Sequence, residues 1–452
     1  MRRNRSWLAG LCALVVAAVG VFDAPISSQV RAPRARTATG VEPAPLTPAA
    51  PEMLGFSAER LARMRDVIGD FVERNELSGA VLLIARDGRL AELSALGQAD
   101  RERGVAMRPD TLFRIASQTK LVTSIAIMML YEEGRLLLTD PVSRFLPELK
   151  SPKVLSSRNG AAPATADREI TIRDLLTHRA GFTYGFFDDG PVGDAYRAEG
   201  VTDGLAAGEI TLAANVTRLA RLPLVAQPGS GFHYGLSTDV LGRVVEVISG
   251  RSLDVVFEER IFKPLGMADT SFSVPDAKWP RLAVAYTAGE AGSLRPMKDP
   301  ESFNLTVMSP WEYYRPTKKY FSGGAGLVST AADYARLLEM LRRGGALAGT
   351  RLLSPKTVEL MTTSHTSDIP AASGALLGPG SQFGLGVQVV TDVGAYQAPG
   401  SPGAYGWGGI YGSTYWVDPK ERLVALLMAQ QYPGPPRWNA IFRTMVYQAI
   451  VH

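Results

Sequence analysis

The 452-residue sequence has little of the chemistry on which many enzymes depend. It contains one cysteine, Cys12, and four histidines. A single cysteine excludes a disulfide scaffold, and because Cys12 lies in a segment expected to be removed, a thiol nucleophile and a cysteine-ligated metal are excluded as well. The HExxH, Walker A and strand-led GxGxxG motifs are absent, and so is the GxSxG motif of the α/β-hydrolases. The sequence therefore predicts no metal and no cofactor.

Net positive charge is confined to the first residues. The formal net charge is +4, but residues 1–40 hold six arginines against one aspartate, a net of +5 that leaves −1 for the remainder (+4 minus +5). A near-neutral body lacks the basic face that nucleic-acid binding requires, so no nucleic-acid partner is predicted. The 46% hydrophobic and 20% charged residues are typical of a globular protein with a large core.

The N-terminus has the pattern of an export signal. Arginines precede the apolar run Trp7–Phe22, which at 16 residues is shorter than the roughly 20 that a membrane span takes. We expect residues 1–24 to be a signal peptide, with an uncleaved N-terminal anchor as the alternative. The mature protein would then be periplasmic or secreted, without a membrane span. Residues 25–52 are rich in proline and alanine and are predicted to be a linker, followed by one folded domain over 53–452.

Strand signals lie near both ends of that domain and helix signals between them. Asp87-Gly88 between two apolar runs predicts a hairpin, because both turn residues need positive φ. Later strand-like runs are Gly384–Val390, Thr414–Val417 and Leu423–Ala429, and a terminal helix follows Pro436. This arrangement predicts an α+β fold, in which one antiparallel sheet built from both ends and flanked by N- and C-terminal helices meets a mostly helical lobe at a cleft.

One short segment combines a nucleophile with a base. In Ser117-Gln118-Thr119-Lys120, a strand-like stretch precedes the serine and an apolar helix follows it. Ser117 then lies at a helix N-terminus, where the helix dipole favours a developing negative charge, and Lys120 shares its face. A lysine in apolar surroundings tends to lose its proton and can then act as a base beside the hydroxyl. The alternative is that Ser117 only caps the helix and Lys120 is a surface lysine.

Two further segments contain candidate site residues. Tyr234 stands just before a helix that starts near Ser237, and its alternative interpretation is a core aromatic. Trp407-Gly408-Gly409-Ile410 belongs to a glycine-rich run, which indicates close approach of backbone or ligand, or else a bulged strand. His178 and His233 are interpreted as helix-end or loop histidines rather than members of a serine triad.

In this order and spacing the segments resemble the serine β-lactamase and penicillin-binding-protein superfamily in its class C-like branch, and most of all the family VIII carboxylesterases. The resemblance runs from Leu54 to the C-terminus and includes residues 170–182, 238–250 and 323–338. It implies a β-lactamase/transpeptidase-like fold, with 53–452 as the catalytic domain and a helical lobe over roughly 120–330.

The resemblance also implies a role for each candidate residue. Ser117 would be the acylated nucleophile, Lys120 its proton acceptor, and Tyr234 would share the base role and protonate the leaving group. Trp407, Gly408 and Gly409 would take the place of the family's Lys-Thr-Gly strand and contact the substrate. The backbone N–H groups of Ser117 and Ile410 would form the oxyanion hole.

Two departures from the family pattern bear on the substrate. Leu236 stands at the third position of a Tyr-x-Asn motif, and Trp407 replaces the cation that β-lactamases and peptidases usually carry. An uncharged site favours neutral esters over anionic β-lactams or peptide carboxylates. The expected activity is hydrolysis of short-chain carboxylic esters, with a small-molecule ester as the partner. A cation supplied by a loop would weaken this expectation, and the candidates are Arg315, Lys318 and Lys319.

Other activities remain open on the same fold. They are a class C-type β-lactamase or D,D-peptidase, an acyltransferase that passes the acyl group to an alcohol, and a non-catalytic cell-wall binding protein.

Overall fold

The computed structural model describes residues 46–155, 162–369, 376–434 and 436–452. The predicted signal peptide and residues 25–45 of the predicted linker lie outside the described residues. The end of that predicted linker is part of the fold, because β1 (Thr47–Pro48) pairs in parallel with β3 and is followed by η1 (Pro51–Leu54). The fold therefore begins before residue 53. The proline- and alanine-rich composition gave no indication of this edge strand, which is held by main-chain hydrogen bonds to the β3 hairpin.

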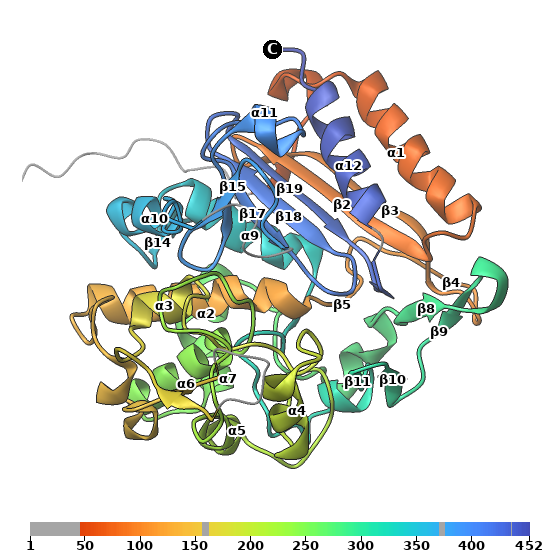
Figure 1. The fold of residues 1–452 in the computed structure, drawn as a ribbon. Coiled ribbons are helices and arrows are strands. Elements are labelled where there is room, and N and C mark those ends of the chain that lie inside the picture. Colours follow the sequence, from red (N-terminus) through yellow and green to blue (C-terminus); the bar gives the residue numbers. More distant parts are fainter. Residues whose placement is uncertain (1–45, 156–161, 370–375, 435) are drawn as a thin grey trace, which may run out of the picture. The chain divides into compact units, whose positions relative to one another are not determined.

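A central sheet is built from both ends of the sequence, as predicted (Figure 1). Its order is β1-β3-β2-β19-β18-β17-β16-β15, with β4 beside β3, and only the β1–β3 pair is parallel. The predicted hairpin is present, with φ of 53° at Asp87 and 76° at Gly88. The strands are β2 (Gly79–Arg86), β3 (Arg89–Asp100), β4 (Val105–Ala106), β15 (Ser381–Phe383), β16 (Gln388–Val390), β17 (Tyr405–Gly408), β18 (Thr414–Asp418) and β19 (Leu423–Met428).

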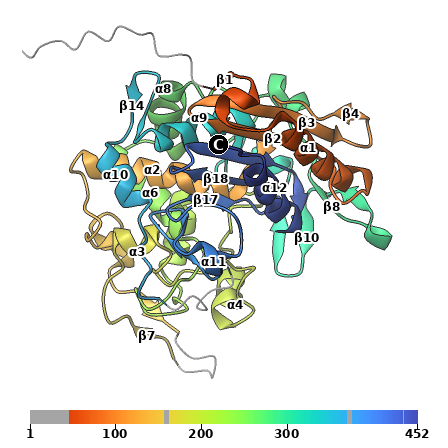
Figure 2. The same cartoon turned by 90° about the horizontal axis from the view of Figure 1, so that it is seen from above.

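Helices cover both faces of this sheet. The terminal helices α1 (Ala58–Glu73) and α12 (Pro436–Gln448) lie side by side on one face, and α9 (Ala331–Arg342) packs on the other (Figures 1 and 2). Alternate residues of β2 pack on opposite faces of the sheet. Leu82 belongs to the hydrophobic cluster under α1 and α12, and Leu83 belongs to the larger core on the other face. Helices on both faces explain why every residue of β2 is buried.

The second lobe is centred on α2 (Thr119–Glu132) and α6 (Ser237–Ser249). Thr171 and Asp174 form a capping box at the start of α3, and Gly250, with φ of 70°, ends α6. Residues 286–308 differ from the helical expectation, because they form short strands that pair locally. The other helices are α3 (Ile172–Leu176), α4 (Pro191–Ala198), α5 (Leu212–Leu219), α7 (Leu253–Phe257), α8 (Lys263–Leu265), α10 (Pro355–Met361) and α11 (Val393–Tyr396).

Several short elements complete the fold. One of them, β5 (Phe113–Arg114), pairs with β12 (Val328–Ser329) and so brings the chain before residue 117 to the chain after residue 322. The other strands are β6 (Lys153–Val154), β7 (Ala164–Thr165), β8 (Tyr286–Ala288), β9 (Leu294–Pro296), β10 (Glu301–Phe303), β11 (Thr306–Met308), β13 (Ala346–Leu347), β14 (Thr350–Arg351) and β20 (Gln431–Tyr432). The short 3-10 or π turns are η2 (Ala116–Gln118), η3 (Val142–Arg144), η4 (Pro147–Leu149), η5 (Glu258–Phe262), η6 (Asp276–Arg281), η7 (Glu290–Gly292) and η8 (Glu312–Tyr314).

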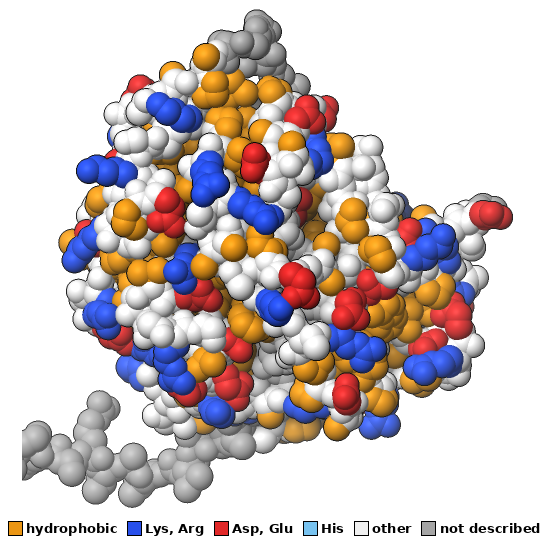
Figure 3. Space-filling model, turned by 90° about the horizontal axis from the view of Figure 1, so that it is seen from below, with side chains coloured by type: hydrophobic (Ala, Val, Ile, Leu, Met, Phe, Trp, Pro, Cys, Tyr) orange, Lys and Arg blue, Asp and Glu red, His pale blue; other side chains and the backbone are white. Residues whose placement is uncertain are grey.

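Charges of both signs are interspersed on the face seen from below (Figure 3). That face shows no large patch of one sign. Among the described residues, no helix combines the length and the apolar character needed to span a bilayer.

Candidate active site

Ser117 lies where the chain enters the central helix of the lobe. From β5 the chain turns through η2 and continues into α2. Ala116, beside the serine, has a φ of 42°, in the left-handed region that residues with a side chain rarely adopt. Such a backbone persists only where its surroundings impose it, and it is common at functional sites. Here the half-buried Ser117 lines a cavity.

Lys120 lies behind Ser117 and is 1% exposed. Its Nζ is 3.2 Å from Ser117 Oγ, 2.8 Å from the Tyr184 hydroxyl and 2.9 Å from the Gly324 carbonyl oxygen. The alternative of a surface lysine is therefore wrong. Because a hydroxyl can donate to Nζ or accept from it, this geometry suits a proton that passes from Oγ to nitrogen.

Tyr184 and Asp239 are neighbours of Lys120 that the sequence patterns did not identify. Tyr184 is buried, its ring stacks on Phe186, and burial raises the pKa of its hydroxyl well above 10, so it is protonated at neutral pH. Burial also raises the pKa of Asp239, while hydrogen bonding and Lys120 lower it. No sequence signal marked Asp239, because acidic residues are common in the first turn of a helix and only the fold shows that this one is buried. Tyr184 lies outside any helix or strand and carries no local pattern.

Tyr234 lies in the same cluster but has a different hydrogen-bond partner. The Trp407 indole Nε1 donates to the Tyr234 hydroxyl at 3.0 Å, and Lys120 Nζ lies 4.6 Å from the centre of the Tyr234 ring. Among the described residues, no hydrogen bond joins Tyr234 to Ser117 or Lys120. The structure thus brings two phenols to the lysine, and it is Tyr184 whose hydroxyl contacts the amine.

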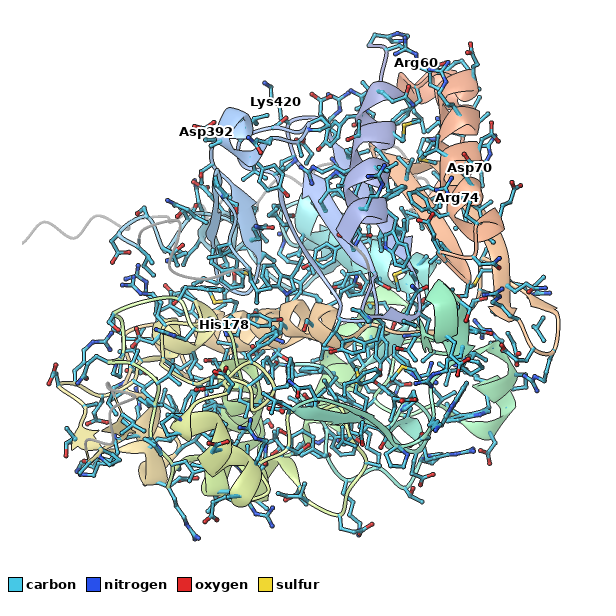
Figure 4. The ribbon with its side chains drawn as sticks, turned by 45° about the vertical axis from the view of Figure 1, so that its right-hand side comes forward. Arg60, Asp70, Arg74, His178, Asp392 and Lys420 are labelled. Atoms are coloured by element: carbon cyan, nitrogen blue, oxygen red, sulfur yellow. The ribbon has the colours of Figure 1, made fainter. Side chains whose placement is uncertain are left out.

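The two histidines near the cluster are not bonded to the serine. His178 is buried directly after α3, and burial, with a smaller effect of Lys120, lowers its pKa well below 6.5, so its ring is neutral. Its ring packs on that of Tyr234 with centroids 4.6 Å apart, and Figure 4 shows it at the level of α2. His233 is half-buried, and neither histidine hydrogen-bonds to Ser117 within the described part of the chain.

The end of β17 meets the chain just before Ser117. A side chain at Gly409 would lie 2.6 Å from the Ile115 carbonyl oxygen, so only glycine allows this approach. The contact places Ile410 beside Ser117 on the cavity wall. The Ile410 N–H donates to no described group of the chain, and Ile410 lies after the end of β17. It is therefore free to bind an oxygen of a substrate.

One cavity of about 680 Å³ contains these groups. Its lining includes Ser117, Tyr184 and Tyr234 from the helical lobe and Trp407, Gly408, Gly409 and Ile410 from the sheet. Asp203 and Arg443 are the charged side chains on the described wall. Asp203 accepts from the Gly185 N–H at 2.8 Å, and burial raises its pKa to about 7.

The loop cations considered above do not line this cavity within the described residues. The Arg315 guanidinium stacks on Trp279, the Lys318 amine donates to backbone carbonyls, and Lys319 pairs with Glu209. The cavity also has two charged residues that the sequence patterns did not identify, because Asp203 reaches it from the lobe and Arg443 from α12. The described residues hold no group of three or more His, Cys, Asp or Glu side chains suited to a metal ion.

The similarity of this chain to known proteins agrees with the geometry. The sequence matches the beta-lactamase family over residues 64–449. The chain belongs to this family. The predicted superfamily and fold are thereby confirmed.

Three relatives illustrate the family's range. Protein Rv1367c of Mycobacterium tuberculosis is 39% identical over 365 residues, which cover 79% of this chain and 86% of that protein. Esterase EstB of Burkholderia gladioli is 35% identical over 379 residues, covering 82% and 91%. The solved structure of EstCE1, described as a hydrolase with promiscuous acyltransferase activity, is 32% identical with a TM-score of 0.75, covering 86% of this chain and 99% of that one.

Proposed function

We propose that the protein is a serine hydrolase that cleaves carboxylic esters of small molecules through an acyl-Ser117 intermediate. The observation that carries the proposal is the 3.2 Å contact between Lys120 Nζ and Ser117 Oγ at the wall of the cavity. The names of EstB and EstCE1, an esterase and a hydrolase, support the same reaction class.

The proposed reaction has two steps. Ser117 Oγ attacks the ester carbonyl carbon while its proton moves to Lys120, and the resulting oxyanion lies between the N–H groups of Ser117 and Ile410. Each such donor typically stabilises the transition state by about 3–4 kcal/mol. The bond to the alcohol oxygen then breaks, a proton from the lysine–tyrosine cluster neutralises the alkoxide, and water hydrolyses the acyl-serine by the reverse route. These steps call for no bound metal or cofactor.

Trp407 supports a preference for an uncharged group near the serine. It stands where relatives that bind anionic substrates carry a cation, and Asp203 on the lobe side, whose pKa is raised to about 7 by burial, supplies no positive charge in its place. A carboxylate next to the scissile bond is therefore disfavoured. Comparison of nitrocefin and penicillin hydrolysis with short acyl ester hydrolysis separates this proposal from a β-lactamase or D,D-peptidase.

Transfer of the acyl group to an alcohol is a second candidate activity. EstCE1 is described as having such a side activity, and a 680 Å³ cavity has room for an alcohol in place of water. Added alcohol should then yield a new ester, detected by mass spectrometry, at the expense of free acid.

We also propose export of the protein, with residues 1–24 removed and the mature chain periplasmic or secreted. The proposal rests on the charged and apolar pattern of the first residues. Fractionation of cells and the intact mass of the mature chain test it. A full-length chain retained in the cytoplasm would contradict it.

The decisive test of the hydrolase is Ser117→Ala. It should abolish hydrolysis of p-nitrophenyl butyrate and stoichiometric labelling by a fluorophosphonate. Ser249→Ala is the control, because it makes the same change at a half-buried serine at the end of α6 and off the cavity wall. Wild-type turnover in Ser117→Ala would disprove the mechanism.

A further inference from the structure

The cavity extends past the serine onto the other face of the sheet. Gly406 and Gly408 of β17 pair with Trp416 and Thr414 of β18, and directly paired residues point to the same face. Trp416 packs with α1 and α12, so this is the face that those helices cover. Both glycines line the cavity together with residues of α11 and α12, so the cavity continues along this face toward the two helices.

We call this continuation the outer arm, defined by Gly406, Tyr396 and Gln397 at α11, and Asn439, Ala440 and Arg443 on α12. Figure 1 shows α11 and α12 together above β17 and β18, and Figure 4 locates the start of α11 at Asp392, its N-cap. Gly409 and Gly406 are three residues apart, about 10 Å along a strand. The outer arm therefore begins at least about 10 Å from Gly409, which lies against the chain just before Ser117.

A buried cation lines the outer arm. Arg443 is 8% exposed, its Nε donates to the Pro399 carbonyl at 2.8 Å, and its guanidinium lies 5.0–5.4 Å from the rings of Tyr396, Trp416 and Tyr447. Its Nη2 is buried against Gly400 without a hydrogen-bond partner, its Nη1 donates to no described group, and no ion pair joins Arg443 to a described carboxylate. Asp418, the nearby acid, accepts instead from the Tyr447 hydroxyl at 2.7 Å.

Asn439 adds a second unsatisfied group one helical turn away. Its Oδ1 is buried without a partner, and it lines the same arm four residues before Arg443. Burial of polar groups without partners is unfavourable, and most such groups in proteins are satisfied by the protein, by water or by a ligand. The guanidinium supplies N–H donors to a carboxylate, and the side-chain NH2 of Asn439 on the same wall is a second donor, whereas its buried Oδ1 is an acceptor and takes no part.

We propose that the outer arm binds a carboxylate at the far end of the substrate. The natural ester then has an uncharged reacting end, next to Trp407, and an acidic end at least about 10 Å away, beyond Gly406 and next to Arg443. This inference rests on the proposed function and specifies its substrate class: esters of long dicarboxylic or hydroxy acids rather than simple alkyl esters.

Matched pairs of esters test the proposal. The first pair is mono(p-nitrophenyl) suberate and p-nitrophenyl octanoate, in which the acid is on the acyl side. The second pair is 8-acetoxyoctanoate and octyl acetate, in which the acid is on the alcohol side. Wild-type enzyme should favour the anionic member of at least one pair, through KM rather than kcat, and the pair that responds identifies the half of the substrate in the outer arm.

Arg443→Met should lower that selectivity, measured as the ratio of kcat/KM values, by about tenfold, the typical effect of one charge-assisted hydrogen bond. Arg437→Met, on the exposed side of α12 and off the cavity wall, is the matched control and should leave the ratio unchanged. Asn439→Asp places a carboxylate one turn from Arg443 without emptying a buried site, so it should also lower the ratio even if Arg443→Met folds poorly.

The outcomes separate the two hypotheses. If the wild-type enzyme hydrolyses esters but neither pair responds to Arg443→Met or Asn439→Asp, the carboxylate subsite is disproved and the hydrolase stands. If the enzyme hydrolyses no ester, the proposed function fails. Calorimetric binding of the suberic acid monoanilide to wild type and Asn439→Asp then decides the subsite alone: weaker binding in the variant supports it, and equal or undetectable binding in both overturns it.

Discussion

Two lysines turn their amino groups toward the same glycine-rich loop, and their surroundings differ. Lys120 donates to the carbonyl of Gly324, and Lys318 donates to the carbonyl of Gly326, two residues on. Lys120 also contacts two hydroxyl groups, whereas the other partner of Lys318 is the Phe272 carbonyl. The Lys318 residue is half-buried, but its Nζ lies 3.6 Å from the centre of the Tyr313 ring.

The comparison shows that desolvation alone does not make a lysine a reactive base. Burial alone lowers the pKa of Lys318 well below 10.5, yet the hydrogen-bond partners of its nitrogen among the described residues are two carbonyl oxygens, which have no proton to give. Lys120 faces a hydroxyl that lines a cavity. A lysine therefore becomes a useful base through the groups around it, whereas Lys318, beside two carbonyl groups, only stabilises the loop.

The largest expected effect tests this contrast directly. Lys120→Met should lower kcat/KM for p-nitrophenyl butyrate by about 10³-fold, within the range for loss of a general base. Lys318→Met should retain most activity but reduce the free energy of unfolding by about 1–3 kcal/mol, because two carbonyl groups lose their donor. Steady-state kinetics and urea unfolding measure the two effects.

The opposite results for the two variants would contradict this interpretation of the lysines. If Lys318→Met were the inactive variant while remaining folded, or if Lys120→Met kept wild-type activity, the geometry around Ser117 would not describe the reacting groups.

Tyr184 and Tyr234 allow a second comparison, within the Lys120 cluster. We expect Tyr234→Phe to lower kcat/KM for an ethyl ester by about 10²-fold, and that for a p-nitrophenyl ester by less, because p-nitrophenolate leaves without protonation. Tyr184→Phe should slow both esters equally, by about tenfold, because it removes the 2.8 Å contact with the lysine rather than a proton donor to the leaving group.

Kinetics with both esters in both variants provide the measurement. If Tyr184→Phe were the variant sensitive to the leaving group, the protonating role expected for Tyr234 would belong to Tyr184.

Much of the fold was predictable because its signals are local. The positive φ values at Asp87 and Gly88 and the capping box at Thr171 need only two to four consecutive residues. The strand β1 was missed, because a two-residue edge strand in proline- and alanine-rich sequence is recognised only from its partner β3. The short strand β15 was missed for the same reason.

The site residues also divide into those that local sequence predicts and those that only the fold brings together. Ser117 and Lys120 are three residues apart, so the helix itself brings their side chains together. Tyr184 reaches the lysine from a loop 64 residues away, and Arg443 enters the cavity from the last helix. Contacts of this kind depend on packing between elements, and no spacing in the sequence encodes them.

A smaller effect is expected at Trp407. Trp407→Phe removes the indole N–H that donates to the Tyr234 hydroxyl at 3.0 Å and keeps an aromatic ring on the cavity wall. We expect a fall in kcat/KM of about fivefold, the equivalent of one neutral hydrogen bond. Trp416→Phe, on the opposite face of the sheet, is unsuitable as a control because it contacts Arg443, so Trp311→Phe serves instead. A fall as large as that of Tyr234→Phe would mean that Trp407 does more than orient the phenol.

The smallest expected effect is a pH dependence of stability due to Lys318. Because burial lowers its pKa in the folded protein below the ordinary 10.5, the unfolded chain binds more protons between these two values. The free energy of unfolding should therefore rise with pH across that interval, by at most about 1.4 kcal/mol per pH unit. In Lys318→Met this rise should be absent, whereas Lys319→Met, which removes an exposed lysine paired with Glu209, should retain it. Urea unfolding from pH 7 to pH 10 measures the three proteins. A parallel pH dependence in wild type and Lys318→Met would show that the amine keeps its proton among the rings, and the two lysines would then differ less than their surroundings indicate.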